Sequence, residues 1–134
     1  MRTLILAAAL AVFPLTAVAQ TAAPSPSVRA MAAGYKALTV CSALKTAEAA
    51  GGARALASVE GNELVGIYPE LDALVREMPV TIGERQVSVP WDDVMPPRIA
   101  IHAPGRGCAI QPVGWTGQSP RMLLPGVRAN APLA

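Results

Sequence analysis

Residues 97–112 constrain the fold of this chain more than any other stretch. Apolar and polar residues alternate along it, on either side of a Pro-Gly-Arg-Gly turn. Apolar residues with a period of two around a short, glycine-containing loop are typical of a β-hairpin with one buried face. The alternation assigns Ile99 and Ile101 of the first strand, and Cys108 and Ile110 of the second, to that buried face.

The first 19 residues have the features of a secretory signal peptide. Arg2 supplies a positive charge, residues 4–12 are apolar and uncharged, and Ala17-Val18-Ala19 places small residues where signal peptidase cleaves. The apolar run is much shorter than the ~20 residues that a membrane-spanning helix needs. We therefore expect cleavage after Ala19 and a periplasmic or secreted product without a membrane span.

The two cysteines of the chain, Cys41 and Cys108, lie in different halves of the sequence. In an exported chain two cysteines are more often paired than free. Cys41 lies beside the apolar face of a predicted helix and Cys108 lies on the inward face of the hairpin, so both are expected to point into one core. We predict a disulfide between them. A zinc site is disfavoured, because these cysteines and His102 give only three candidate ligands without close spacing.

The composition argues against two classes of partner. The formal net charge of the whole chain is +2, and loss of Arg2 with the signal peptide would lower it further. Basic residues occur singly, without aromatic residues between them, so neither nucleic acid nor an anionic membrane surface is an expected partner. Few aromatic residues remain after the signal peptide, and we expect a thin hydrophobic core.

The mature chain predicts one small α+β module with disordered ends. We expect an antiparallel sheet of three to four strands, formed by residues 80–82, residues 86–91 and the hairpin, together with a long N-terminal helix and a short amphipathic helix. The predicted boundaries are a signal peptide over residues 1–19, a disordered tether over 20–27, the module over 28–114 and a linker-like tail over 115–134.

The long helix is predicted from Val28 to about Lys45 or Glu48. Arg29 and Lys36 are expected to point away from its apolar face. Four residues fall on that face: Met31, Tyr35, Leu38 and Ser42.

The short helix is predicted between Pro69, which suits the first helical position, and Pro79, which stops it. Acidic residues near its start complement the helix dipole. Its apolar stripe is expected to pack on the sheet.

Ser42 and Lys45 match the serine–x–x–lysine pattern of penicillin-recognising hydrolases, in which the lysine accepts the proton of the serine. Any serine three residues before a lysine satisfies this pattern. Ser42 also falls late in the helix, whereas the family's serine opens one, and the second and third motifs of the family are absent. We therefore predict no catalysis by Ser42.

Two other groups of polar residues are not expected to form a catalytic or metal site. His102 closes a strand without a nucleophile in register, and is expected to be a solvated or hydrogen-bonded loop residue. Asp92 and Asp93 are adjacent at a strand end, so their carboxylates should point apart, and no third oxygen ligand is suitably spaced for calcium. The sequence therefore predicts no catalytic residue, no metal site and no cofactor.

Several short segments together resemble a known family. They are Ala33-Gly34-Tyr35-Lys36-Ala37 with Cys41-Ser42-Ala43, Asn62-Glu63-Leu64 with Gly66-Ile67-Tyr68-Pro69-Glu70, Val87-Ser88-Val89, Pro96-Pro97-Arg98-Ile99-Ala100, and Gly107-Cys108 followed by Pro112 and Gly114. This set, which covers Met31 to Gly114, resembles the N-terminal lead-in of exported bacterial serine hydrolases in the superfamily of β-lactamases and penicillin-binding proteins.

The resemblance implies an accessory module that precedes a catalytic domain. The family's nucleophile lies well downstream of the glycine–cysteine segment, so none of its catalytic residues can be assigned to this sequence. The chain is then expected to be either the start of a longer gene or a stand-alone remnant. The alternative is a secreted binding or structural module unrelated to hydrolases, and the frame that follows the last codon would discriminate between the two.

Overall fold

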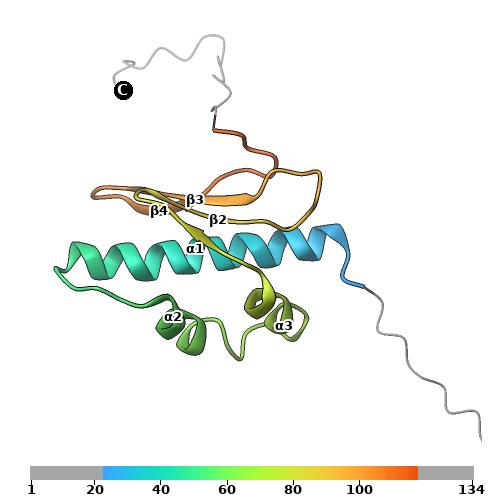
Figure 1. Ribbon diagram of the computed structural model, residues 1–134, viewed down its shortest axis with the longest axis horizontal. Helices are drawn as coiled ribbons and strands as arrows, with labels where there is room; N and C mark the ends of the chain where they lie inside the picture. Colours follow the sequence, from blue (N-terminus) through green and yellow to red (C-terminus); the bar gives the residue numbers. More distant parts are fainter. Residues whose placement is uncertain (1–22, 118–134) are drawn as a thin grey trace, which may run out of the picture.

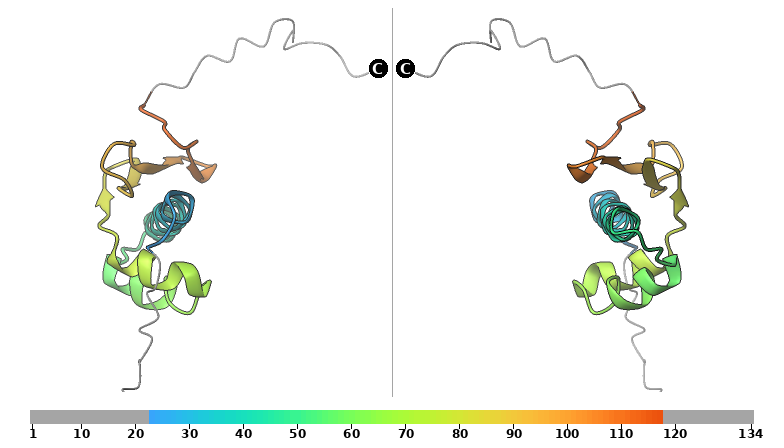
Figure 2. Two further views of the ribbon diagram at one scale, coloured as in Figure 1. Left: turned by 90° about the vertical axis from the view of Figure 1, so that its right-hand side faces the viewer. Right: turned by 90° about the vertical axis from the view of Figure 1, so that its left-hand side faces the viewer.

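The computed structural model describes residues 23–117, in which one long helix is enclosed between a sheet and two shorter helices (Figure 1). Helix α1 spans Pro26–Ala49, with the sheet on one side and α2 and α3 on the opposite side (Figure 2). The predicted signal peptide and most of the predicted tail lie outside the described residues. The predicted α+β class is confirmed.

Helix α1 begins two residues earlier than the sequence pattern predicts. Ser25 is its N-cap, since the Ser25 hydroxyl accepts a hydrogen bond from the backbone N–H of Val28, and Pro26 occupies the first turn. The prediction of a disordered tether over residues 20–27 is therefore wrong for Pro26 and Ser27. Ser25 and Pro26, which lie within the predicted tether, are the start signal of the helix.

Helices α2 and α3 form the layer on the other side of α1 from the sheet. They span Leu56–Asn62 and Pro69–Glu77. Pro69 begins α3 as predicted, and Leu71 and Val75 bury its apolar stripe. The expectation that this stripe packs on the sheet is wrong, because α3 lies against α1 (Figure 2). The apolar stripe of α3 is therefore buried by α1 and not by the sheet.

The sheet has four antiparallel strands in sequential order. They are β1 (Thr81–Ile82), β2 (Gln86–Val89), β3 (Arg98–Ala103) and β4 (Gly107–Ile110). The β3–β4 pair is the predicted hairpin, and Gly105 and Gly107 adopt positive φ angles of 73° and 77° in its turn, a conformation that favours glycine. One face of this sheet covers α1.

The buried face of β3 differs from the prediction. Cys108 and Ile110 of β4 pair with His102 and Ala100, so the side of β3 that faces α1 carries Ala100 and not Ile99 or Ile101. Ala100 is fully buried, as are Ala33 and Ala37 of α1. Small side chains on both surfaces let the helix lie close to the sheet. The stabilisation from this close packing outweighs what burial of the larger isoleucine side chains would contribute.

The buried faces of α1 also differ from the prediction. Met31, which was assigned to the core, is 51% exposed, whereas Lys36, which was expected to point to solvent, is only 1% exposed. Because α1 is covered on two opposite sides, its buried positions are mostly small; they are Ala30, Ala32, Ala33, Gly34, Lys36, Ala37, Val40, Cys41, Leu44 and Lys45. The stripe of Met31, Tyr35, Leu38 and Ser42 is left between the two layers, and we call it the open face.

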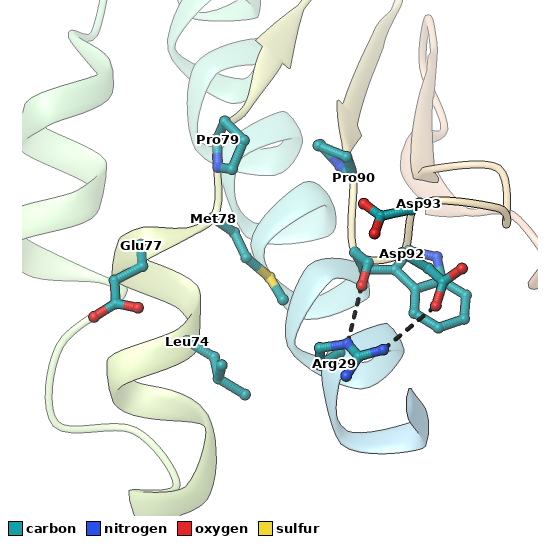
Figure 3. A pocket seen from close by; sticks show the side chains of 9 residues that line it. Arg29, Leu74, Glu77, Met78, Pro79, Pro90, Asp92 and Asp93 are labelled. Carbon is teal, nitrogen blue, oxygen red and sulfur yellow. Dashed lines mark hydrogen bonds and ion pairs between the residues drawn. The ribbon is translucent and has the colours of Figure 1, made fainter. Parts of the chain in front are cut away.

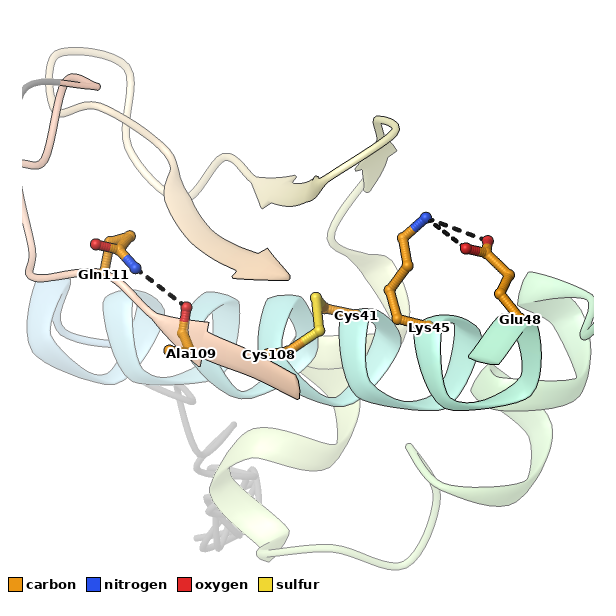
Figure 4. Close-up of a disulfide and its surroundings, with 6 residues drawn as sticks. All are labelled: Cys41, Lys45, Glu48, Cys108, Ala109 and Gln111. Carbon is orange, nitrogen blue, oxygen red and sulfur yellow. Dashed lines mark hydrogen bonds and ion pairs between the residues drawn. A yellow bond between two sulfur atoms is a disulfide. The ribbon is translucent and has the colours of Figure 1, made fainter. Parts of the chain in front are cut away.

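The predicted disulfide is present between Cys41 of α1 and Cys108 of β4 (Figure 4). The Cα atoms lie 6.1 Å apart, within the range that a disulfide permits. Disulfides persist mainly in oxidising compartments, so the bond is consistent with export. No helix in the part of the chain that the structure describes is long and apolar enough to cross a membrane.

Candidate functional site

The open face of α1 borders an apolar groove of about 700 Å³. Met31, Tyr35 and Leu38 of α1 line one wall, and Ile110 and Val113 line the other. Met31 and Val113 are both about half exposed, at 51% and 52%. A groove of this size with so few polar walls is typical of a binding surface for an apolar partner.

A second hollow of about 620 Å³ continues along the same side of α1. It is lined by the C-terminal half of the helix, including Leu38, Ser42 and Thr46, and by Arg54 and Glu63 at its far edge. Leu38 borders both hollows, so they form one continuous surface along most of α1. The groove and the second hollow together therefore give this side of the central helix an extended surface for binding.

Arg98 is the one charged residue that lines the groove. Its guanidinium lies over Gly34 of α1, where a methyl group would be only 3.2 Å from Nη2. Nη2 donates a hydrogen bond to the backbone oxygen of Gln111 at 3.3 Å, and Nε is buried without a hydrogen-bond partner in the part of the chain that the structure describes. Burial lowers the pKa of Arg98, but a guanidinium remains charged at neutral pH.

A polar cleft of about 490 Å³ lies between α3 and the segment that follows β2 (Figure 3). Arg29 lies inside it, where its Nε donates to the backbone oxygen of Trp91 at 3.1 Å and its Nη2 to Asp92 Oδ2 at 3.3 Å. The Asp92 side chain also accepts hydrogen bonds from the backbone N–H groups of Val94 and Met95. These two bonds, assisted by Arg29, hold the pKa of Asp92 below its usual value.

The contacts in this cleft stabilise the fold. Arg29 and Asp92 satisfy one another, and Asp92 fixes the turn after β2, so neither is free to act on a ligand. Asp93 is exposed and makes no hydrogen bond to Asp92 in the described part of the chain. Among residues 23–117 there is no group of three His, Cys, Asp or Glu side chains that could hold a metal ion.

Ser42, Lys45 and His102 line one small pocket of about 250 Å³ beside Cys108. Their roles differ from those in a catalytic pair, because Lys45 Nζ is held by Glu48, at 2.8 and 3.1 Å from its two carboxylate oxygens (Figure 4). Within the described residues the Ser42 hydroxyl makes no hydrogen bond to Lys45 or His102. The pocket therefore brings the three residues together without activating a nucleophile.

We expect the purified chain to hydrolyse neither β-lactams nor simple esters or amides. Ser42→Ala should leave any background rate unchanged, because acyl transfer needs an activated serine, a base and donors for the oxyanion arranged together. Incubation with a fluorescent acylating probe checks this, with Thr46→Ala on the same helix as a matched control. Stoichiometric labelling of Ser42, lost in Ser42→Ala, would contradict the prediction.

Comparison with known protein families, with curated proteins and with solved structures finds no match in any of the three. The resemblance to the lead-in of β-lactamase-like hydrolases therefore stays a prediction. Sequence reasoning missed Arg98 and the open face as site features. The residues that carry them come from α1, β3 and β4, so only the tertiary contact between Gly34 and Arg98 could have indicated the groove.

Proposed function

We propose that residues 28–114 form an exported accessory module, which docks through the open face of α1 onto the catalytic domain of a β-lactamase-like serine hydrolase. The observation that carries this proposal is the uncovered apolar side of the central helix. The module itself contributes no catalytic residue. The compartment would be the periplasm or the extracellular space.

The physical support is the position of the apolar side chains. Large apolar residues on a helix normally face the core, and a contiguous exposed group of them marks an interaction site. Here the alanines fill the space between the layers. Met31 and Val113 are about half exposed, and Tyr35, Leu38 and Ile110, which are partly buried against the core, line the groove between them. A helix-lined groove is a common receptor for a segment of a second protein.

The sequence resemblance supports the choice of partner. Its segments, from Met31 to Gly114, come from α1, the α2–α3 region, β2 and parts of the β3–β4 hairpin. In hydrolases of this kind the lead-in precedes the catalytic domain in the same polypeptide. A domain tethered in this way has a high effective concentration, so even a groove with modest intrinsic affinity would stay occupied.

The alternative function is a stand-alone secreted binding module. The disulfide favours it as much as it favours the first proposal, because small exported domains with thin cores depend on such crosslinks. The nucleotide sequence beyond the last codon discriminates between the two. A frame that encodes a serine–x–x–lysine domain supports the accessory role, and its absence supports the stand-alone module.

The docking test uses the domain encoded by that frame, co-expressed with the module and purified. Met31→Asp should weaken the measured affinity at least tenfold, because it places a charge in the lining of the apolar groove. Val94→Asp is the matched control, since Val94 is 90% exposed and lies outside the groove. Equal affinities of the wild type and Met31→Asp would argue against docking through the open face.

A further inference from the structure

Arg98 is a charged residue with unused hydrogen-bonding capacity in an otherwise apolar groove. Among the described residues its guanidinium makes one hydrogen bond, to the backbone oxygen of Gln111, and its Nε makes none. No carboxylate within residues 23–117 forms an ion pair with it, whereas Arg29, Arg54 and Arg76 each have an acidic partner. The charge of Arg98 is therefore left uncompensated by the residues that the structure describes.

The fold makes room for this guanidinium. Position 34 is a glycine inside a helix, which costs about 1 kcal/mol of helix propensity relative to alanine. A side chain there would press against the guanidinium, since even its first carbon would lie 3.2 Å from Nη2 and 3.4 Å from Nε. The glycine thus lets Arg98 lie flat against α1 at the edge of the open face.

When an apolar partner covers the groove, it removes water from Arg98. A buried guanidinium without a counter-charge is strongly unfavourable, whereas a carboxylate can accept two parallel hydrogen bonds from it. A partner that supplied only apolar atoms would therefore lose part of the energy gained from Met31 and Leu38. Charge complementarity favours a partner with one acidic group among apolar ones.

We infer that the segment that occupies the groove carries an aspartate or glutamate flanked by apolar side chains, and that its carboxylate pairs with Arg98. This inference rests on the proposed docking function and specifies the chemistry of the partner. A protein segment is favoured over a small amphiphile because the groove continues into the second hollow along α1, which gives an elongated surface.

The experiment titrates the disulfide-bonded chain, labelled with nitrogen-15, with two peptides. One is acetyl-Ala-Leu-Glu-Leu-Ala-amide, and the other has glutamine in place of glutamate, so the two differ only in the charge. We expect the glutamate peptide to shift the backbone amide signals of Gly34 and Ile110 and to bind about tenfold more tightly. The difference should shrink as the salt concentration rises.

Variants of the arginine separate its charge from its structural role. Arg98→Gln should bind both peptides equally, while Arg98→Lys should keep part of the preference for glutamate. Arg106→Gln is the matched control, since Arg106 is exposed in the β3–β4 turn, and it should keep the full preference. The spread of amide signals shows for each variant whether the chain is folded.

The possible failures have different meanings. If both peptides shift the groove signals and bind the wild type equally, the role of Arg98 is overturned while the docking face stands. If the preference survives in Arg98→Gln, the carboxylate binds elsewhere and the inference is again overturned. If neither peptide shifts any groove signal, the docking face itself is contradicted, and the inference falls with it.

Discussion

Replacement of both Cys41 and Cys108 by alanine is expected to lower the free energy of unfolding by about 4 kcal/mol. The bond joins residues 67 positions apart, and in the chain-entropy model such a crosslink removes a large part of the freedom of the unfolded chain. It also holds β4 on α1 at the point where the hairpin meets the helix (Figure 4). For a core made largely of alanine and valine, this is a substantial share of the total stability.

Urea denaturation followed by circular dichroism measures this loss. The oxidised wild type, the wild type in reductant and the double-alanine variant are compared under the same conditions. The reduced wild type should unfold at nearly the same urea concentration as the double variant, which shows that the crosslink and not the side chains is responsible. A midpoint of the double variant equal to that of the oxidised wild type would contradict the prediction.

Lys36→Met is expected to lower the free energy of unfolding by about 2–3 kcal/mol. Lys36 is 1% exposed, and its Nζ donates to the backbone oxygen of Met78 at 2.7 Å and lies 2.8 Å from Glu60 Oε1. The one ammonium group thus links α1 to α2 and to the end of α3. Methionine fills the space of the lysine stem but leaves both acceptors without a donor. Glu60 is one third exposed, which limits the cost.

Urea denaturation of two further variants tests the origin of the loss. Lys36→Met with Glu60→Gln should recover part of it, because the unpaired charge is removed. Arg76→Gln breaks an exposed ion pair with Asp72 on α3 and should cost about 0.5 kcal/mol or less. A Lys36→Met variant as stable as Arg76→Gln would mean that the buried ammonium does not hold the three helices together.

The sequence predicts best where one local signal decides the structure. Proline at both ends delimits α3, and the glycine-containing turn with alternating flanks delimits the β3–β4 hairpin. The pairing of Cys41 with Cys108 follows from the number of cysteines and from the expected export. These features depend on neighbouring residues or on a single possible partner, so tertiary packing does not change them.

The buried faces were predicted wrongly for a common physical reason. The assignment of Met31 to the core, and of Ile99 and Ile101 to the inward face of β3, assumes that the largest apolar side chains are buried. A helix enclosed between two layers needs small residues on two sides, so Ala33 and Ala37 are buried in their place. Hydrophobic periodicity shows which residues share one face of a helix or strand. It does not show which of these faces a second layer will cover.

The burial of Lys36 and the position of Arg98 in the groove could not have been predicted from the sequence. Charged side chains are rarely buried without partners, so the pattern places them in solvent. Lys36 is buried because Glu60 and the carbonyl of Met78, both distant in the sequence, converge on it. Arg98 lies in the groove because Gly34 leaves it space. Each of these contacts exists only in the folded chain.

Oxidative footprinting of the module, alone and in complex with the β-lactamase-like catalytic domain proposed as its partner, tests the docking of the open face most directly. Met31 and Met95 are exposed by 51% and 40%, so they oxidise at comparable rates in the free module. Met31 borders the groove and Met95 lies outside it. In the complex we predict that oxidation of Met31 slows at least fivefold while that of Met95 is unchanged. Undiminished oxidation of Met31 in a complex that demonstrably forms would contradict the proposal.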